Sequence, residues 1–222
     1  GGGDLLLAIA KLLPVSEGLK ETLDAWGRNL RGIDIHGEFV ASSKYRLALQ
    51  AIASGAARER VNRDDILGYF PGVQRGDGLQ AKDEFAIATH IVTNPPFSSA
   101  QSPKGCEWTS GRVNSAALFM DTIVCNATSS TRIWAILPDV LRSGTRYEQW
   151  RHLIDSRLRG IEVTKIGQFS RHADIDVFVL EGIVRSKVKK SNINGNPLLE
   201  DSPEDCQQTL GDLFTVRVGP VV

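Results

Sequence analysis

The residues whose types and spacing best suit chemistry are Asn94-Pro95-Pro96-Phe97, which follow the short apolar run Ile91-Val92. The apolar run predicts a buried strand. Two consecutive prolines fix φ at about −65°, remove two backbone donors and keep the residue before each one extended. The alternative is an ordinary strand-ending turn. Because proline is only about 5% of residues, the tetrapeptide should arise by chance in roughly one chain of this length in a thousand.

This segment has the groups needed to activate an aromatic exocyclic amine. Such an amine is a weak nucleophile because its lone pair is conjugated with the ring. The side-chain oxygen of Asn94 and the carbonyl of Pro95 can accept hydrogen bonds from its two N–H groups and draw the nitrogen toward tetrahedral geometry. Phe97 can stack on the base, a contact worth about 1–3 kcal/mol. A base inside a duplex must first flip out, which costs a few kcal/mol, so a second aromatic residue is expected.

The elements that position this segment follow from the hydrophobic pattern. Strands alternate with helices and end in an antiparallel pair, which predicts an α/β fold with a mostly parallel sheet and one reversed strand. The first helix is apolar nearly all round, so we expect it to be buried. The predicted helices are 4–13, 39–57, 114–127 and 147–158, and the predicted strands are 30–35, 73–79, 91–93, 133–137, 162–169 and 175–184.

Further polar or glycine positions fall where strands of this sheet should end. Ligands of open α/β sheets bind beyond the carboxyl ends of the strands. Gly1–Gly3 would let the backbone approach a ligand at a helix N-terminus, although it is also typical of a cloning remnant. Asp34 could accept hydrogen bonds from a ribose diol or cap the next helix. Asp77 could bind a nucleoside amine or form an Asx turn.

Composition narrows the class of protein. The chain has 222 residues, 41% of them apolar, with 26 basic and 26 acidic side chains, which suits a globular protein with a full core. No apolar run reaches membrane length and no signal peptide is visible, so we expect a cytoplasmic protein without membrane contact. Neither the cysteines nor the histidines show metal-ligand spacing, so we expect no metal. A neutral chain that binds DNA would need another part to supply much of the phosphate contact.

The Asn94–Phe97 motif resembles the catalytic motif of the adenine-N6 DNA methyltransferases that use S-adenosylmethionine. Gly1–Gly3 resembles the end of that family's first motif, and the chain around 117–151 resembles its restriction–modification members. The resemblance implies a Rossmann-like fold with its first strand apparently missing from this chain. It also implies a set of site residues: Asn94, Pro95, Pro96 and Phe97 for catalysis; Gly1, Gly3, Asp34, Ile35, Asp77 and Gly78 for the cofactor; and Phe169 as the second aromatic on the flipped adenine, with Lys104 and Trp108 also near the substrate.

The resemblance further implies a division of the chain and a set of partners. Residues 1–186 would form a catalytic domain, and 187–222 a linker and the start of a target-recognition region. DNA, a target-recognition domain and a restriction nuclease are the implied partners. Two alternatives stay open: a methyltransferase that acts on an RNA base or a protein glutamine, and a catalytically silent DNA-binding or cofactor-binding module.

Overall fold

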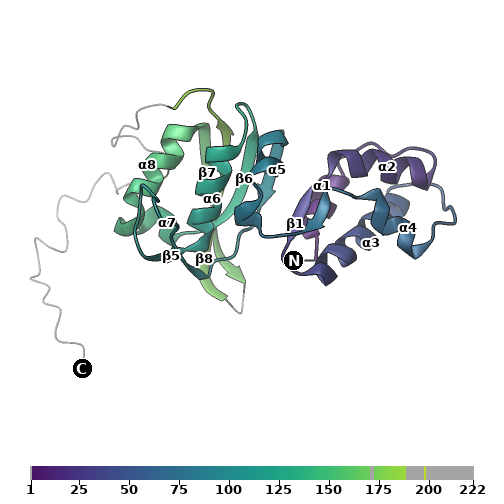
Figure 1. Ribbon diagram of the computed structural model, residues 1–222, viewed down its shortest axis with the longest axis horizontal. Helices are drawn as coiled ribbons and strands as arrows, with labels where there is room; N and C mark the ends of the chain where they lie inside the picture. Colours follow the sequence, from purple (N-terminus) through teal and green to yellow (C-terminus); the bar gives the residue numbers. More distant parts are fainter. Residues whose placement is uncertain (1, 171–172, 189–197, 199–222) are drawn as a thin grey trace, which may run out of the picture.

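The computed structural model describes residues 2–170, 173–188 and 198, and it divides them between two hydrophobic cores. The two cores lie side by side along the long axis of the molecule (Figure 1). The N-terminal part surrounds a parallel pair of short strands, β1 and β2, with four helices. Its elements are α1 (Asp4–Ala10), α2 (Leu19–Asn29), β1 (Gly32–Asp34), α3 (Gly37–Ala53), α4 (Arg63–Tyr69) and β2 (Val73–Arg75).

The second part contains a four-stranded sheet in the order β3-β6-β8-β7. Strands β3 and β6 are parallel, whereas β8 is antiparallel to both of its neighbours. A separate antiparallel hairpin, β4–β5, follows β3. The elements are η1 (Gly78–Gln80), α5 (Lys82–Ile87), β3 (His90–Thr93), β4 (Ser99–Gln101), β5 (Arg112–Asn114), α6 (Ser115–Asn126), β6 (Arg132–Pro138), α7 (Val140–Ser143), η2 (Thr145–Tyr147), α8 (Glu148–Arg157), β7 (Leu158–Ser170) and β8 (Ala173–Val184).

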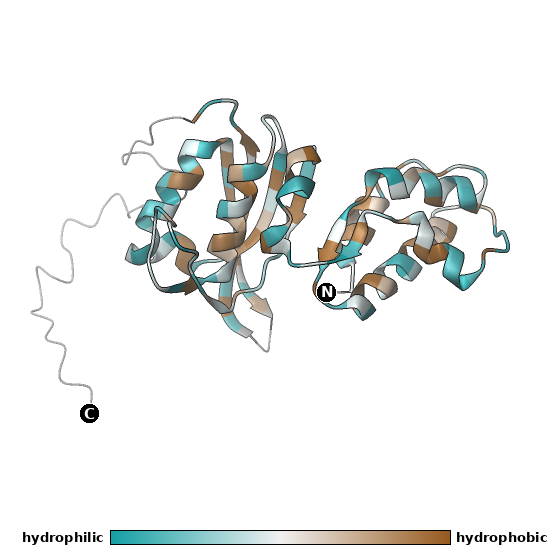
Figure 2. Cartoon of the chain, viewed as in Figure 1, coloured by the Kyte–Doolittle hydropathy of each residue, from teal (hydrophilic) through white to brown (hydrophobic). Residues whose placement is uncertain are grey.

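Large aromatic side chains are fully buried in each core. Trp26 and Phe70 are fully buried in the first core, where the Trp26 indole donates to the Pro14 carbonyl at 2.9 Å. Trp150 and Phe178 are fully buried in the second, and Trp150 donates to a carbonyl of α6. Apolar residues run along the strands of the four-stranded sheet, while the helices carry polar stretches outward (Figure 2). This is the binary pattern expected of packed α/β layers.

The mixed α/β class is confirmed, but the described residues do not form one continuous, mostly parallel sheet. The pair β1–β2 is not hydrogen-bonded to the four-stranded sheet. A cavity of about 760 Å³ lies between them and is lined by residues of both β1 and β3. The two strand edges cannot pair across such a gap, because neighbouring strands must lie roughly 4.8 Å apart.

The first helix also differs from its prediction, since it was expected to be buried. Only Ala10 is buried in α1, and Leu12, just beyond it, is 84% exposed. The physical reason is the cavity: Leu6 and Ile9 pack against the first core but also line the cavity, so they are only half-buried. The predicted region 187–222 lies outside the described residues except for 187, 188 and 198. No helix of the described chain is long and apolar enough to span a membrane.

Candidate active site

The Asn94–Phe97 loop leaves the end of β3 with its side chains in distinct environments. Asn94 is exposed, and its side chain forms no hydrogen bond with the described residues. Pro95 is buried, whereas Phe97 is half-buried and packs against the second core. The loop therefore presents an available amide above a fixed backbone, as the two prolines predict.

A cavity of about 420 Å³ brings together three of the residues selected from the sequence. Gly3 from the start of α1, Asp34 from the end of β1 and Asn94 from the end of β3 all line it. Its volume is within the usual range for small-molecule sites. Residues from both parts of the chain thus meet at the carboxyl ends of two strands, where ligands of open α/β sheets bind.

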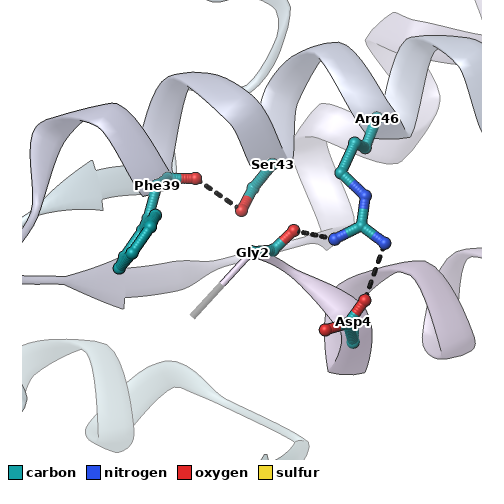
Figure 3. A network of polar contacts seen from close by, with 5 residues as sticks. All are labelled: Gly2, Asp4, Phe39, Ser43 and Arg46. Atoms are coloured by element: carbon teal, nitrogen blue, oxygen red, sulfur yellow. Dashed lines mark hydrogen bonds and ion pairs between the residues drawn. The ribbon is translucent and has the colours of Figure 1, made fainter.

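The glycine turn before α1 is held against α3. Arg46 donates to the carbonyl of Gly2 and pairs with the Asp4 carboxylate at 2.6 Å (Figure 3). Gly3 has φ 85°, a left-handed conformation, and a Cβ placed on it would lie 2.5 Å from Ser43 Oγ. Glycine is required here both for its backbone angle and for the close approach of α3. Gly1 lies outside the described residues.

Asp34 is oriented by the backbone that follows it. Its Oδ1 accepts a hydrogen bond from the His36 N–H at 2.9 Å. Burial alone would raise the pKa of the Asp34 carboxyl, but hydrogen bonds, including the one from His36, outweigh it and leave the pKa below its usual value. The carboxylate is therefore ionised at neutral pH and suited to accept from hydroxyls. The adjacent Ile35 is 58% exposed.

Asp77 and Gly78 lie away from the cavity that contains Asn94. The Asp77 carboxylate accepts from the Leu79 N–H at 2.9 Å, which is the Asx turn that the sequence allowed. Gly78 lines the 760 Å³ cavity, and a Cβ on it would lie 2.6 Å from the Phe119 ring. Gly78 therefore lies on the neighbouring cavity, whereas the Asp77 carboxylate is hydrogen-bonded within its own turn.

The residues selected for substrate binding fall into two places. Phe169 is 44% exposed and meets Phe97 edge-to-face, with ring centroids 5.6 Å apart. Trp108 is instead only 7% exposed, and its indole donates to Asp121 at 3.0 Å. Lys104 and Trp108 line a separate cavity of about 620 Å³. Phe169, the predicted second aromatic, therefore lies in contact with Phe97, whereas Trp108 is buried and supports the 102–111 segment.

No cluster of three or more metal-ligating side chains occurs among the described residues.

The loop after Asn94 is anchored by Asn114 and Ser115 at the start of α6. Asn and Ser are typical helix caps, and no local pattern indicates that these two also reach a loop at least 17 residues earlier.

Comparison with known proteins finds a solved structure with the same fold. No family model and no curated protein matches the sequence. Among solved structures, the M protein of the type I restriction enzyme EcoKI superposes with a TM-score of 0.54 at 17% identity, over 78% of this chain and 35% of that one. This chain shares that fold. It spans about a third of the EcoKI M protein, so the likeness concerns one part of it.

Two further structures are less similar. One comes from a study of complex assembly in the type I R-M system, with a TM-score of 0.42 at 13% identity over 81% of this chain and 44% of that one. The other is the type IIG restriction endonuclease BpuSI, with a TM-score of 0.40 at 16% identity over 84% of this chain and 28% of that one. The fold assignment rests on the EcoKI M protein alone.

Proposed function

We propose that this chain is the catalytic part of a methyltransferase that transfers the methyl group of S-adenosylmethionine to the N6 amine of adenine in DNA, within a restriction–modification system. The observation that carries the proposal is the shared cavity, where Gly3, Asp34 and Asn94 converge. Support comes from the Asn-Pro-Pro-Phe sequence at the end of β3 and from the fold shared with the EcoKI M protein.

The chain's own residues have the chemistry that the reaction needs. The Asn94 side-chain oxygen and the Pro95 carbonyl accept hydrogen bonds from the two N6 hydrogens. This localises the lone pair on the nitrogen and makes it nucleophilic. The nitrogen would bond to the methyl carbon as the carbon–sulfur bond breaks, and the methylated nitrogen would then lose one proton to water. No general base is therefore required in the motif, and neither oxygen needs a shifted pKa. Phe97 stacks on the adenine, and Phe169 supplies the second ring after the edge-to-face contact opens. Water exclusion by these rings strengthens both hydrogen bonds.

The residues around the cavity also fit the cofactor. S-adenosylmethionine supplies an activated methyl group, and its ribose carries two hydroxyls that an ionised carboxylate binds well. Asp34 is such a carboxylate at the cavity wall, and Gly3 leaves the backbone accessible because it has no side chain. Ile35 and Gly78 would flank the cofactor base, with Asp77 at the adjoining turn. Gly1 belongs to the same proposed set.

The finer fold is proposed with the function. We take the architecture to be Rossmann-like, with one further parallel strand between β1 and β3 that unites the two sheets. The 760 Å³ cavity supports this reading, because residues of both strands and apolar residues of α1 line it. A target-recognition domain that carries basic residues, and a restriction nuclease, are the proposed partners, since the chain has equal numbers of basic and acidic side chains and no net positive charge.

The test is transfer of labelled methyl by the full-length gene product to DNA, RNA and protein. Label in adenine N6 of DNA is the expected result. Label only in RNA or protein would replace the DNA proposal with the alternative methyltransferase, and no label in any substrate would support a silent binding module. Asn94→Ala should abolish transfer while leaving cofactor affinity within about twofold. Asn62→Ala removes another exposed asparagine, one without a capping hydrogen bond, and should keep full activity.

A further inference from the structure

The first two residues of the loop that follows Asn94 cannot donate backbone hydrogen bonds. Pro95 and Pro96 have no backbone N–H, so only their carbonyl groups can be anchored. The anchor comes from Ser115, the first residue of α6. Its hydroxyl donates to the Pro96 carbonyl at 2.6 Å and also lies 2.9 Å from the Ser98 carbonyl, while its backbone N–H donates to that second carbonyl at 2.8 Å.

The preceding residue, Asn114, completes the attachment. Its Nδ2 donates to the Phe97 carbonyl at 3.1 Å, while its Oδ1 accepts from the Ala116 N–H at 2.9 Å and so caps α6. Its backbone N–H donates to the Tyr147 hydroxyl at 3.0 Å. Ser115 is 3% exposed and Tyr147 is 7% exposed, so these bonds form where water competes little.

The carbonyl groups of residues 96, 97 and 98 are therefore all held by Asn114 and Ser115. The carbonyl of Pro95, one residue earlier, receives no hydrogen bond from the described residues, and the Asn94 side chain has none either. The two acceptors that the proposed reaction uses are thus the two that the attachment leaves available. They lie directly before the fixed segment, so its orientation sets theirs.

We infer that Asn114 and Ser115 are positioning residues for the amine-activating pair, Asn94 and Pro95. The inference rests on the proposed function and extends it to two residues that touch neither substrate nor cofactor. The start of α6 fixes the direction of the Pro95 carbonyl through Pro96, Phe97 and Ser98. Releasing the carbonyl groups of residues 96–98 would leave the cavity intact but misplace the acceptors, and a misplacement of 1 Å can cost about 100-fold in rate.

The two roles of Asn114 can be separated by one substitution. Asn114→Asp keeps a side-chain oxygen for the Ala116 N–H, and Asp is as good a cap as Asn. It removes the Nδ2 donor and places a carboxylate against the Phe97 carbonyl. Ser115→Ala removes the second donor. Thr122→Val is the matched control, because Thr122 also lies on α6 and donates its hydroxyl to a carbonyl, that of Leu118, at 2.9 Å.

The experiment uses the full-length gene product with DNA and S-adenosylmethionine. Asn114→Asp and Ser115→Ala should each lower kcat by about 10- to 100-fold, with the KM and Kd for the cofactor within twofold of wild type. Thr122→Val should keep wild-type kcat. A merely structural role would lower stability and cofactor affinity together and would not single out kcat. Wild-type kcat in both variants would overturn the inference.

Amide hydrogen exchange at residue 115 provides a second readout that does not depend on activity, because its backbone N–H donates to the Ser98 carbonyl at 2.8 Å. Both variants should raise exchange at this amide, whereas Thr122→Val should not. If the wild-type protein methylates no DNA, the proposed function fails, and exchange still decides whether Asn114 and Ser115 hold the loop. Unchanged exchange in Asn114→Asp, the variant that keeps the helix cap, would then overturn the positioning role.

Discussion

Gly3→Ala tests how the start of α1 is fitted against α3. A Cβ on Gly3 would lie 2.5 Å from Ser43 Oγ, 2.8 Å from Ser43 Cβ and 3.2 Å from Ser43 Cα. Rotating the serine hydroxyl relieves only the first contact, because the other two atoms belong to the helix itself. The two helices must therefore move apart, or the turn before α1 must change its conformation.

The expected cost has two parts. A left-handed conformation costs a residue with a Cβ roughly 1–2 kcal/mol, and inserting an atom into a closely packed contact costs about 1–3 kcal/mol. Together they predict a loss of roughly 2–5 kcal/mol in the free energy of unfolding. Gly167→Ala is the matched control, since Gly167 has φ 83° and nothing lies within 4 Å of its added Cβ. It should lose only the conformational part, roughly 1–2 kcal/mol.

The assay is urea unfolding followed by both circular dichroism and tryptophan fluorescence. Coincident transitions are needed before one free energy describes a chain with two cores. In thermal scans, each kcal/mol should shift Tm by about 2–4 °C for a chain of this size. Losses for Gly3→Ala and Gly167→Ala that agree within about 0.5 kcal/mol would refute the packing argument, because the loss of chain entropy in the unfolded state is common to both variants.

Two further predictions follow from close contacts elsewhere. Gly27→Ala should lower the free energy of unfolding by about 1–3 kcal/mol or more, because its Cβ would lie 1.7 Å from the Tyr69 carbonyl oxygen; wild-type stability in urea would contradict this. Burial and a hydrogen bond to Asp121 raise the pKa of Cys125 to about 11, so it stays a thiol at neutral pH and its thiolate appears only as the pH approaches that value. Iodoacetamide at pH 8 should therefore label Cys125 only slowly, as followed by peptide mass spectrometry, and Asp121→Asn should speed this labelling. An unchanged rate would show that Asp121 does not hold the pKa of Cys125 up.

Local pattern was sufficient for elements whose packing repeats along the sequence. The helix predicted at 114–127 is observed as Ser115–Asn126, and the one at 147–158 as Glu148–Arg157. The buried residues of α8 recur on one side of the helix, and the Asn114 side chain caps the start of α6, so periodicity indicates α8 and a cap indicates α6. The antiparallel pair β7–β8 was equally predictable, because a short polar segment joins two apolar runs.

Contacts between distant segments were not predictable in this way. The 98–111 segment is polar and shows no strand pattern, yet Ser99–Gln101 pairs with Arg112–Asn114 as a hairpin. Three-residue strands carry too few residues to show an alternating pattern. Trp108 lies in this polar segment but is buried, because its indole finds Asp121 on α6. Because Trp108 and Asp121 are far apart in the sequence, no local pattern predicts that they form a pair.

The candidate site depends on a junction that the described residues hold only weakly. Polar contacts across it converge on Glu84 of α5, which accepts from Arg31 at 2.7 Å and from Gln74 at 3.0 Å. The Arg31 side chain is 45% exposed, and exposed ion pairs are worth about 0.2–1 kcal/mol. The two cores share no buried residue, so packing does not replace these contacts.

A ligand in the 420 Å³ cavity would touch Gly3 and Asp34 from one part and Asn94 from the other. It should therefore couple the two cores. At a concentration 100 times its Kd, linkage predicts about 2.7 kcal/mol of added stability. If S-adenosylmethionine bridges the junction, both optical transitions should shift upward and become more coincident, and Asp34→Ala should weaken the shift. A shift confined to one transition would place the ligand within one core and remove the shared cavity as the basis of the site.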